Sequence, residues 1–171
     1  RAEVIIHRIR RFAKRQEPER TRTDLNAVID ETSVLLEVEA RRFGVTLVLD
    51  LEPTLAAVLV DQLQIQQVIL NLAHNGMEAM QSSENRRRRV TIRSSLSSAG
   101  EAQVCVHDSG AGMTAAVEAQ AFQPFFTTKP HGVGLGLSLC RAFIKENGGR
   151  LWSQPGADGG TAFFFTLPWA P

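Results

Sequence analysis

The chain has 171 residues, of which 43% are hydrophobic and 22% charged, so it is long enough for one globular domain with a buried core. Its formal net charge of +1 gives no global indication of binding to nucleic acid or to a membrane surface. The longest apolar stretches, such as residues 55–60, have only the length of a strand, so no transmembrane helix is expected. Cys105 and Cys140 fit no metal-binding spacing, and we favour two buried free thiols over a disulfide bond.

The first residues are predicted to be separate from the domain that follows. Apolar residues recur at helical spacing over residues 1–16, which indicates the end of a helix. Pro18 cannot continue that helix, so residues 17–23 are expected to be a linker. No signal peptide is visible. Because Arg1 is not a natural start, we expect a piece of a longer protein.

The remaining residues alternate between helical and strand patterns, which is typical of an α/β domain. Asp24 and Asp61 are expected N-caps of two long helices, Gly44 is expected to end the first, and a third helix is predicted over residues 135–145. Strands are predicted over residues 45–49, 57–60, 90–96, 102–108, 150–153 and 162–167. We therefore expect a two-layer α/β sandwich, with a mixed sheet packed on three helices. Residues 109–133 lack a steady period and indicate a long functional loop.

An acidic residue and two glycines follow the strand predicted over residues 102–108. Asp108 ends that strand, where a carboxylate could accept a hydrogen bond from an adenine amino group. Gly110 and Gly112 would let the base approach the backbone closely. Taken alone, the Asp-Ser-Gly sequence is more often a plain turn, and only the other motifs favour adenine binding.

Three further glycines, Gly132, Gly134 and Gly136, end the long loop and begin the third helix, with Leu135 between the last two. Free N–H groups at a helix N-terminus, aided by the helix dipole, suit a phosphate. A flexible loop before a helix is the alternative. The pattern lacks the Gly-Lys-Ser/Thr ending of a P-loop, and it does not follow a strand as a dinucleotide fingerprint would.

Polar residues recur on one face of the helix predicted after Asp61. Asn71, Asn75 and Glu78 are spaced i, i+4 and i+7, where apolar residues would otherwise be expected. Their oxygens are hard ligands that suit Mg²⁺, which proteins usually hold jointly with phosphate. The alternative is a polar last turn without a ligand. His74, three residues after Asn71, could lie near this site, but we favour a solvent-facing side chain.

The loop before the glycines carries a lysine and several aromatic residues. Lys129 could place a positive charge near a transferring phosphate, although a solvated lysine is an equal alternative. Thr127 and Thr128 could add hydroxyl contacts. Three aromatic residues are expected to anchor the loop at its base: Phe122, Phe125 and Phe126. The four arginines at residues 86–89 lack interleaved aromatic residues and indicate a solvated edge, not a nucleic-acid site.

Together these motifs resemble the ATP-binding catalytic domain of sensor histidine kinases, in the GHKL superfamily, over roughly residues 24–168. The Asn box, first glycine box, Phe box, second glycine box and late glycine motif match residues 71–79, 108–112, 122–129, 132–136 and 159–161. The Phe box is most similar to that of the nitrogen-regulation and oxygen-sensing kinases.

The resemblance implies a Bergerat-type fold with residues 113–133 as a mobile ATP lid. It implies that Asp108 reads adenine, that Asn75 holds Mg²⁺ together with Glu78, and that Asn71 and Lys129 are catalytic. The implied ATP contacts are Asn71, Asn75, Asp108, Gly110, Gly112, Phe122, Thr127, Thr128, Lys129, Gly132, Gly134, Leu135, Gly136 and Thr161. Related hydrolytic ATPases place a glutamate at the position of Asn71. A neutral amide accepts a proton poorly, which favours phosphotransfer over rapid hydrolysis.

The implied partners lie outside the chain: a phosphoacceptor histidine on a helix of a homodimeric parent kinase, then the receiver domain of a response regulator. Residues 1–16 resemble only the second helix of the dimerisation hairpin, and His7 lacks the acidic residue that usually follows the acceptor. Residues 24–171 would be the catalytic domain, located in the cytoplasm, with no contact to nucleic acid or membrane. Two alternatives remain: a GHKL ATPase that drives a conformational cycle, and a nucleotide-sensing interaction module with a degenerate site.

One position departs from the family pattern. Gly76 replaces the alanine that usually follows the second asparagine of the Asn box. Glycine costs about 1 kcal/mol of helix stability relative to alanine, so this turn is expected to be looser.

Overall fold

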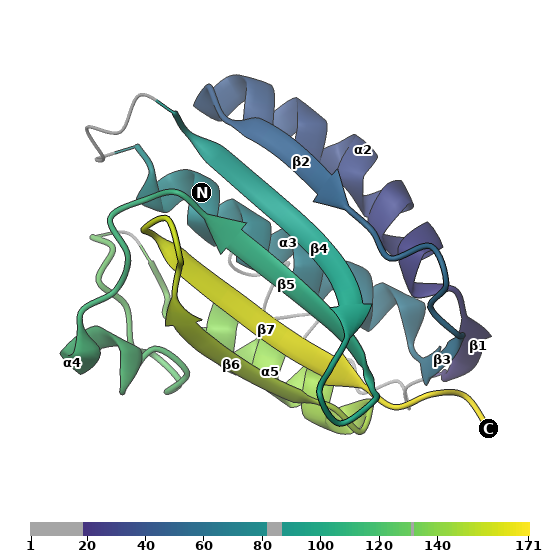
Figure 1. Cartoon of the computed structure of the whole chain (residues 1–171). Helices are drawn as coiled ribbons and strands as arrows, with labels where there is room; N and C mark the ends of the chain where they lie inside the picture. The colour runs from purple at the N-terminus through teal and green to yellow at the C-terminus, as the bar shows by residue number, and fades with distance from the viewer. Residues whose placement is uncertain (1–18, 82–86, 131) are drawn as a thin grey trace.

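The computed structural model describes residues 19–81, 87–130 and 132–171, and its main elements form two layers (Figure 1). One layer is a five-stranded sheet with the strand order β2–β4–β5–β7–β6. Its strands are β2 (Thr46–Asp50), β4 (Arg89–Leu96), β5 (Ala102–Asp108), β6 (Arg150–Pro155) and β7 (Thr161–Leu167). The sheet is mixed, because β2 runs parallel to β4 while the other neighbours pair antiparallel.

The second layer covers one face of this sheet with α2 (Leu25–Phe43), α3 (Gln62–Ala79) and α5 (Gly136–Glu146). α3 packs on β4 and β5, α5 packs on β6 and β7, and α2 lies beside α3. The predicted two-layer α/β sandwich with three helices is confirmed. A short helix, α4 (Ala115–Glu118), interrupts the stretch that was predicted to be a loop throughout.

The predicted helix boundaries are confirmed by their caps. The Asp24 carboxylate accepts hydrogen bonds from two backbone N–H groups of the first turn of α2, at 2.9 and 3.3 Å. Gly44 ends α2 with φ of 64°, a left-handed conformation that glycine adopts without strain. Asp61 caps α3 by accepting from the Gln64 N–H at 3.1 Å.

A two-stranded ribbon lies at the edge of the domain. β1 (Thr21–Thr23) pairs antiparallel with β3 (Val58–Val60), so part of the stretch expected to be a linker forms a strand. The C-terminal residues lie against the same ribbon: Trp169 bridges to Val58, and the Ala170 N–H donates to Ala57 at 2.8 Å. The helix predicted over residues 1–16 lies outside the described residues.

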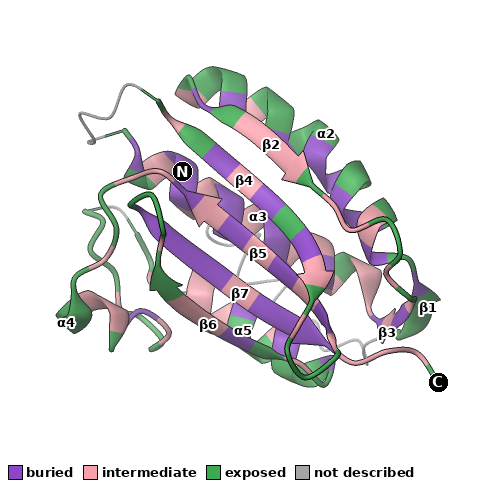
Figure 2. Ribbon diagram, viewed as in Figure 1, coloured by how far each residue is buried: buried purple, intermediate pink, exposed green. Residues whose placement is uncertain are grey.

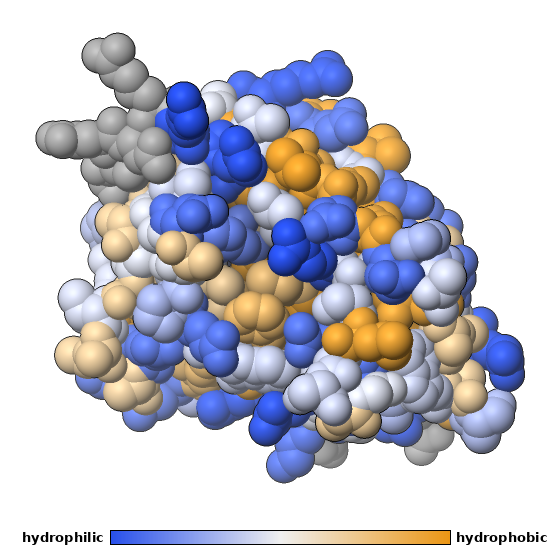
Figure 3. Space-filling model, in the orientation of Figure 1, coloured by the Kyte–Doolittle hydropathy of each residue, from blue (hydrophilic) through white to orange (hydrophobic). Residues whose placement is uncertain are grey.

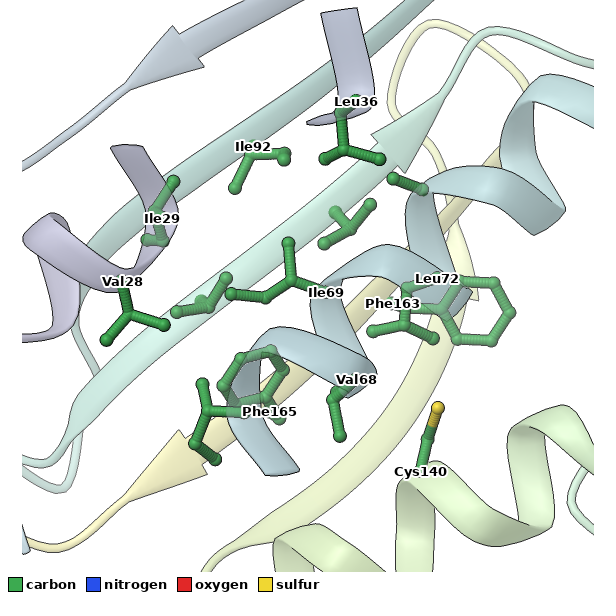
Figure 4. Packing of buried hydrophobic residues seen from close by; sticks show 14 of the residues in the cluster. Val28, Ile29, Leu36, Val68, Ile69, Leu72, Ile92, Cys140, Phe163 and Phe165 are labelled. Carbon is green, nitrogen blue, oxygen red and sulfur yellow. The ribbon is translucent and has the colours of Figure 1, made fainter. Parts of the chain in front are cut away.

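The core lies between the helices and the sheet (Figure 4). Its helical side is the apolar stripe of α2 and α3, which includes Ile29 and Ile69, and β7 contributes Phe165 from the sheet. Figure 2 shows burial along almost the whole of β7, as expected of a strand that lies inside the sheet. Both cysteines are free thiols as predicted, although Cys140 is buried and Cys105 is only half-buried.

The opposite face of the sheet carries no helix among the described residues, and Figure 3 shows hydrophobic and hydrophilic residues interspersed on it. Trp152 of β6 and Phe164 of β7 stack with ring centroids 5.5 Å apart. The Arg150 guanidinium lies 4.5 Å from the Trp152 ring centroid. This stack shields apolar surface on the open face.

Candidate functional site

Asp108 is the last residue of β5 and points inward, because every second residue of this strand is buried against the helices. Only 5% of Asp108 is exposed, and this burial raises the pKa of its carboxyl group. Backbone N–H groups of Gly110, at 2.9 Å, and of Thr161 donate to the carboxylate and oppose that rise. A carboxylate has about four acceptor positions, so Asp108 can still accept a hydrogen bond from a ligand.

Glycines from three segments surround Asp108. A Cβ atom at Gly76 of α3 would lie 2.9 Å from Asp108 Cβ, and one at Gly110 would lie 2.8 Å from Asp108 Oδ1. A Cβ atom at Gly160 would overlap the Asp108 carbonyl oxygen. The departure from the family pattern at Gly76 therefore has a physical reason, since this helix turn packs directly on the acidic residue.

The turn between β6 and β7 also packs on Asp108. Gly159 accepts a hydrogen bond from His107 Nε2 at 2.9 Å, and Gly160 then lies against Asp108. Thr161, the predicted contact from the late glycine motif, is 5% exposed. His107 was not predicted to have a role, because its partner is more than 50 residues away in sequence and only the sheet brings them together.

A second cluster joins α3 to the lid. Lys129 Nζ donates to Asn75 Oδ1 at 2.9 Å and forms an ion pair with Glu78 Oε2. Burial by itself would raise the pKa of Glu78, but the hydrogen bond and charge of Lys129, together with His74, lower it below its usual value. Two predicted metal ligands thus converge on one cation, the lysine ammonium. Among the described residues, no group of three or more His, Cys, Asp or Glu is arranged to hold a metal.

The other predicted residue of this helix face has a different partner. The Asn71 side chain donates a hydrogen bond to the thiol of Cys140 on α5, and burial raises the pKa of that thiol to about 12. Asn75 and Glu78 are therefore brought together with Lys129, whereas Asn71 faces α5.

The lid folds back on itself. The Thr127 hydroxyl accepts from the Lys129 backbone N–H at 3.1 Å, and the Gly132 N–H donates to the Lys129 carbonyl at 3.1 Å. The Phe125 N–H donates to the Gly134 carbonyl at 2.8 Å, and a Cβ atom at Gly134 would overlap the Phe125 backbone. The Phe box and the second glycine box therefore form one compact unit.

This unit leads directly into α5. Leu135 occupies the N-cap position, and no side chain caps the helix. The first backbone N–H groups of α5, which begins at Gly136, are therefore suited to an anion. Two further predicted contact residues are exposed: Gly112, on the segment that follows β5, and Thr128, within the Phe box.

The aromatic residues of the Phe box play different parts. Phe122 packs edge-to-face on Phe163, with centroids 6.2 Å apart, and Arg141 lies 5.4 Å from its ring centroid. Phe122 therefore anchors the lid as predicted, and Phe126 is half-buried. The prediction for Phe125 is wrong: it is 74% exposed. Its φ of 66° turns the side chain outward where its backbone packs against the second glycine box.

The expectation for His74 is also wrong, because this residue is half-buried between α2 and α3. Its Nδ1 atom lies 2.6 Å from Glu39 Oε2, and its Nε2 atom lies 3.4 Å from Glu78 Oε1. Its ring packs edge-to-face on Phe43, with centroids 5.6 Å apart. Sequence reasoning missed Glu39 altogether, since no local pattern tells which α2 residue meets the Asn box.

Comparison with known proteins identifies the family of this chain. Residues 60–171 match the model of the Histidine kinase-, DNA gyrase B-, and HSP90-like ATPase family. The chain is 40% identical to the sensor protein TdiS of Thauera aromatica over 165 residues, which cover 96% of the chain and 30% of TdiS. It is 41% identical to the sensor protein FixL of Bradyrhizobium diazoefficiens over 168 residues, 98% of the chain and 33% of FixL. The chain thus spans about a third of the length of these relatives.

Solved structures of histidine kinases have the same fold as this chain. The nucleotide-free catalytic domain of histidine kinase ThkA superposes with a TM-score of 0.75 and 32% identity, covering 88% of the chain and 95% of that domain. ThkA in complex with the response regulator protein TrrA gives a TM-score of 0.79 and 30% identity, covering 99% of the chain and 48% of ThkA. No helix of the described residues is long and apolar enough to cross a membrane. The chain therefore belongs to the Histidine kinase-, DNA gyrase B-, and HSP90-like ATPase family, as an ATP-binding catalytic domain of the sensor histidine kinase type.

Proposed function

We propose that this domain transfers the γ-phosphate of ATP to a histidine of the parent kinase, from which a response regulator then receives it. One observation carries the proposal. Two consecutive residues of α3 contact the two parts of the proposed site. Gly76 packs on the buried Asp108, and Asn75 accepts a hydrogen bond from the Lys129 ammonium of the lid. A nucleotide whose adenine pairs with Asp108 would thus lie with its phosphates toward Lys129.

ATP binding would use each part of the site for a different end of the molecule. The Asp108 carboxylate would accept a hydrogen bond from the adenine amino group, and Gly110, Gly112 and Thr161 would frame the base. The phosphates would bind the uncapped N-terminus of α5 and the lid. The proposed phosphate-side residues are Thr127, Thr128, Lys129, Gly132, Gly134, Leu135 and Gly136.

The residues present fit a magnesium ion. Asn75 and Glu78 direct an amide oxygen and a carboxylate oxygen at the Lys129 ammonium, which supports this position as one for a cation. Two protein oxygens suffice for Mg²⁺, which usually keeps waters and shares phosphate oxygens. When bound, Mg²⁺ neutralises phosphate charge. Lys129 would then leave its two α3 partners and be available to the γ-phosphate.

Asn71 takes the position at which related hydrolytic ATPases carry a glutamate that activates water. Asn71 is a neutral amide bonded to Cys140, so it would not activate water efficiently. This argues against the rival function, an ATPase that drives a conformational cycle. The second rival is a degenerate nucleotide-sensing module. It is disfavoured because the chain keeps the buried carboxylate of Asp108 and because Asn75 and Lys129 contact each other.

The proposed arrangement assigns residues 1–16 to the end of a dimerisation hairpin and residues 24–171 to the catalytic domain, joined by residues 17–23. The acceptor histidine would lie in another part of a dimeric parent. The ThkA–TrrA complex supports a response regulator as the next partner, since a relative of this domain binds one.

The test is phosphotransfer in trans. The chain would be mixed with γ-labelled ATP, Mg²⁺ and a separately expressed acceptor hairpin of the parent, and the product tested for acid-labile, base-stable label. We expect phosphohistidine with the wild-type chain and none with Asn75→Ala. Fast ATP turnover without label would support the ATPase, and failure to bind ATP would support the degenerate module.

A further inference from the structure

His74 is held firmly beside the proposed metal site, although none of the sequence motifs gives it a role. α2 contributes two of its contacts, the Glu39 carboxylate and the Phe43 ring. α3 contributes the third, the Glu78 carboxylate one helical turn along. The imidazole therefore links a carboxylate of one helix to a carboxylate of the other. The contact to Glu39, at 2.6 Å, is the closer of the two, and the contact to Glu78 is 3.4 Å.

The two oxygens of Glu78 have different partners. Oε1 faces His74 at 3.4 Å, while Oε2 pairs with Lys129, which also bonds Asn75. The Glu78 side chain is 36% exposed and has several rotatable bonds, so burial alone does not fix its direction. The contact to His74 engages one oxygen and leaves the other directed at the position where the lysine ammonium lies.

We propose that Glu39 and His74 are positioning residues that orient Glu78 toward the divalent cation bound with ATP. The inference rests on the proposed function, because it takes Asn75 and Glu78 to be the protein ligands of Mg²⁺. Outer hydrogen-bond partners that orient metal ligands commonly raise metal affinity, and their loss lowers it. Here the outer carboxylate orients an imidazole, and the imidazole orients the ligand.

Glu39 connects the proposed metal site to α2, a helix that lies outside the match to the ATPase family model. It lies on α2, outside residues 60–171 that the model matches. Through His74, the direction of Glu78 depends on how α2 packs beside α3. A displacement of α2 would therefore alter metal affinity without touching the adenine pocket at Asp108.

The competing explanation is that His74 only ties α2 to α3. In that case its removal would lower the stability of the fold, and nucleotide affinity would change equally with and without metal. A positioning role instead predicts a loss confined to the metal-dependent part of nucleotide binding.

The experiment measures the affinity of the 171-residue chain for a non-hydrolysable ATP analogue by calorimetry, once with excess MgCl₂ and once with EDTA. The dissociation constant in EDTA divided by the dissociation constant in MgCl₂ isolates the contribution of the metal to affinity. His74→Ala is expected to lower this ratio about tenfold and to leave the affinity in EDTA unchanged. Glu39→Ala should lower the ratio in the same direction. The double variant should match His74→Ala, because Glu39 acts only through the imidazole.

Glu37→Ala is the matched control, because Glu37 lies on the same helix and, among the residues that the structure describes, pairs only with exposed Arg41, at 3.8 Å. It should leave the ratio unchanged. Urea unfolding of each variant measures stability separately from binding. If His74→Ala does not fold, the affinity ratio of Glu39→Ala tests the positioning role. Equal losses in both conditions, or an unchanged ratio, would overturn the positioning role alone. A wild-type chain that binds no analogue, or binds it equally in EDTA, would overturn the proposed metal site as well.

Discussion

A buried carboxylate is the most specific feature of this domain at the scale of single residues. Asp108 loses solvent contact and is compensated only in part by the N–H groups of Gly110 and Thr161. Burying such a group without a full set of partners is unfavourable for folding. Three glycines pack directly on Asp108. A buried carboxyl group with a raised pKa at such a position supports a role in binding over a role in stability.

Asp108→Ala is expected to weaken binding of an ATP analogue about 10- to 100-fold, the value of a hydrogen bond to a charged group. The control is Asp158→Ala, which removes an exposed carboxylate from the turn that packs on Asp108. Calorimetry would compare both variants with the wild-type chain. Equal affinity of Asp108→Ala and wild type would place adenine recognition elsewhere.

The burial of Asp108 also predicts a pH dependence. Because its folded pKa is raised, the stability it contributes is fully present below its unfolded pKa, about 4, and is lost as pH rises through the folded pKa. Asp108→Asn carries no such charge, so its advantage in free energy of unfolding over wild type should grow from about pH 4 toward neutrality. Urea unfolding of both proteins over this range checks the sign. A difference that shrinks with rising pH would contradict the burial argument.

The residues with chemical motifs could be predicted from sequence, whereas their neighbours could not. Asp108, Asn75 and Lys129 carry recognisable spacings. In the structure Asp108 ends β5, as the strand pattern predicts, and Asn75 and Lys129 contact each other. Glu39 and His107 act through contacts between elements distant in sequence, and no local pattern encodes these contacts.

At the scale of elements, the Lys129 side chain joins the lid to α3. Lys129 reaches from the lid to Asn75 and Glu78, one turn apart on α3. The rest of this part of the lid is mostly exposed, and Phe122 anchors it at the other end. Lys129 therefore tethers the lid to the helix that carries the metal ligands.

Lys129→Met is expected to speed cleavage of the lid by chymotrypsin at Phe125 and Phe126 in the absence of nucleotide, since local opening no longer breaks this tether. An exposed pair of this kind contributes about 1 kcal/mol or less, which corresponds to roughly a fivefold effect at most. Lys145→Met, in the last turn of α5, is the control for loss of a lysine charge. Unchanged cleavage in Lys129→Met would exclude the tether.

Element prediction succeeded where periodicity and caps were strong. The long helices and the main strands were found because alternation and N-caps agreed over many residues. β1 and α4, with 3 and 4 residues, are too short to show a period. β1 exists because β3 pairs with it, which is a tertiary effect.

At the scale of the whole molecule, Asn147 joins the end of α5 to the start of α3. It is 1% exposed, donates to Gln64 Oε1 and the Phe143 carbonyl at 2.7 and 2.8 Å, and accepts from the Asp61 N–H at 2.8 Å. The far ends of the same two helices carry Asn75 and Gly136. The junction at Asn147 therefore ties the two helices together at the ends that lie away from the site.

Asn147→Ala tests whether this junction serves the fold alone. It leaves buried hydrogen-bonding groups without a partner, so the free energy of unfolding should fall by about 2–3 kcal/mol. Gln62→Ala, which loses one exposed hydrogen bond, should change it by less than about 0.5 kcal/mol. Asp61 and Asn75 are separated by roughly 20 Å along α3, so the folded variant should bind an ATP analogue with wild-type affinity. Urea unfolding and calorimetry measure the two effects separately. A fall in affinity in the folded Asn147→Ala chain would mean that the junction also sets the geometry of the nucleotide site.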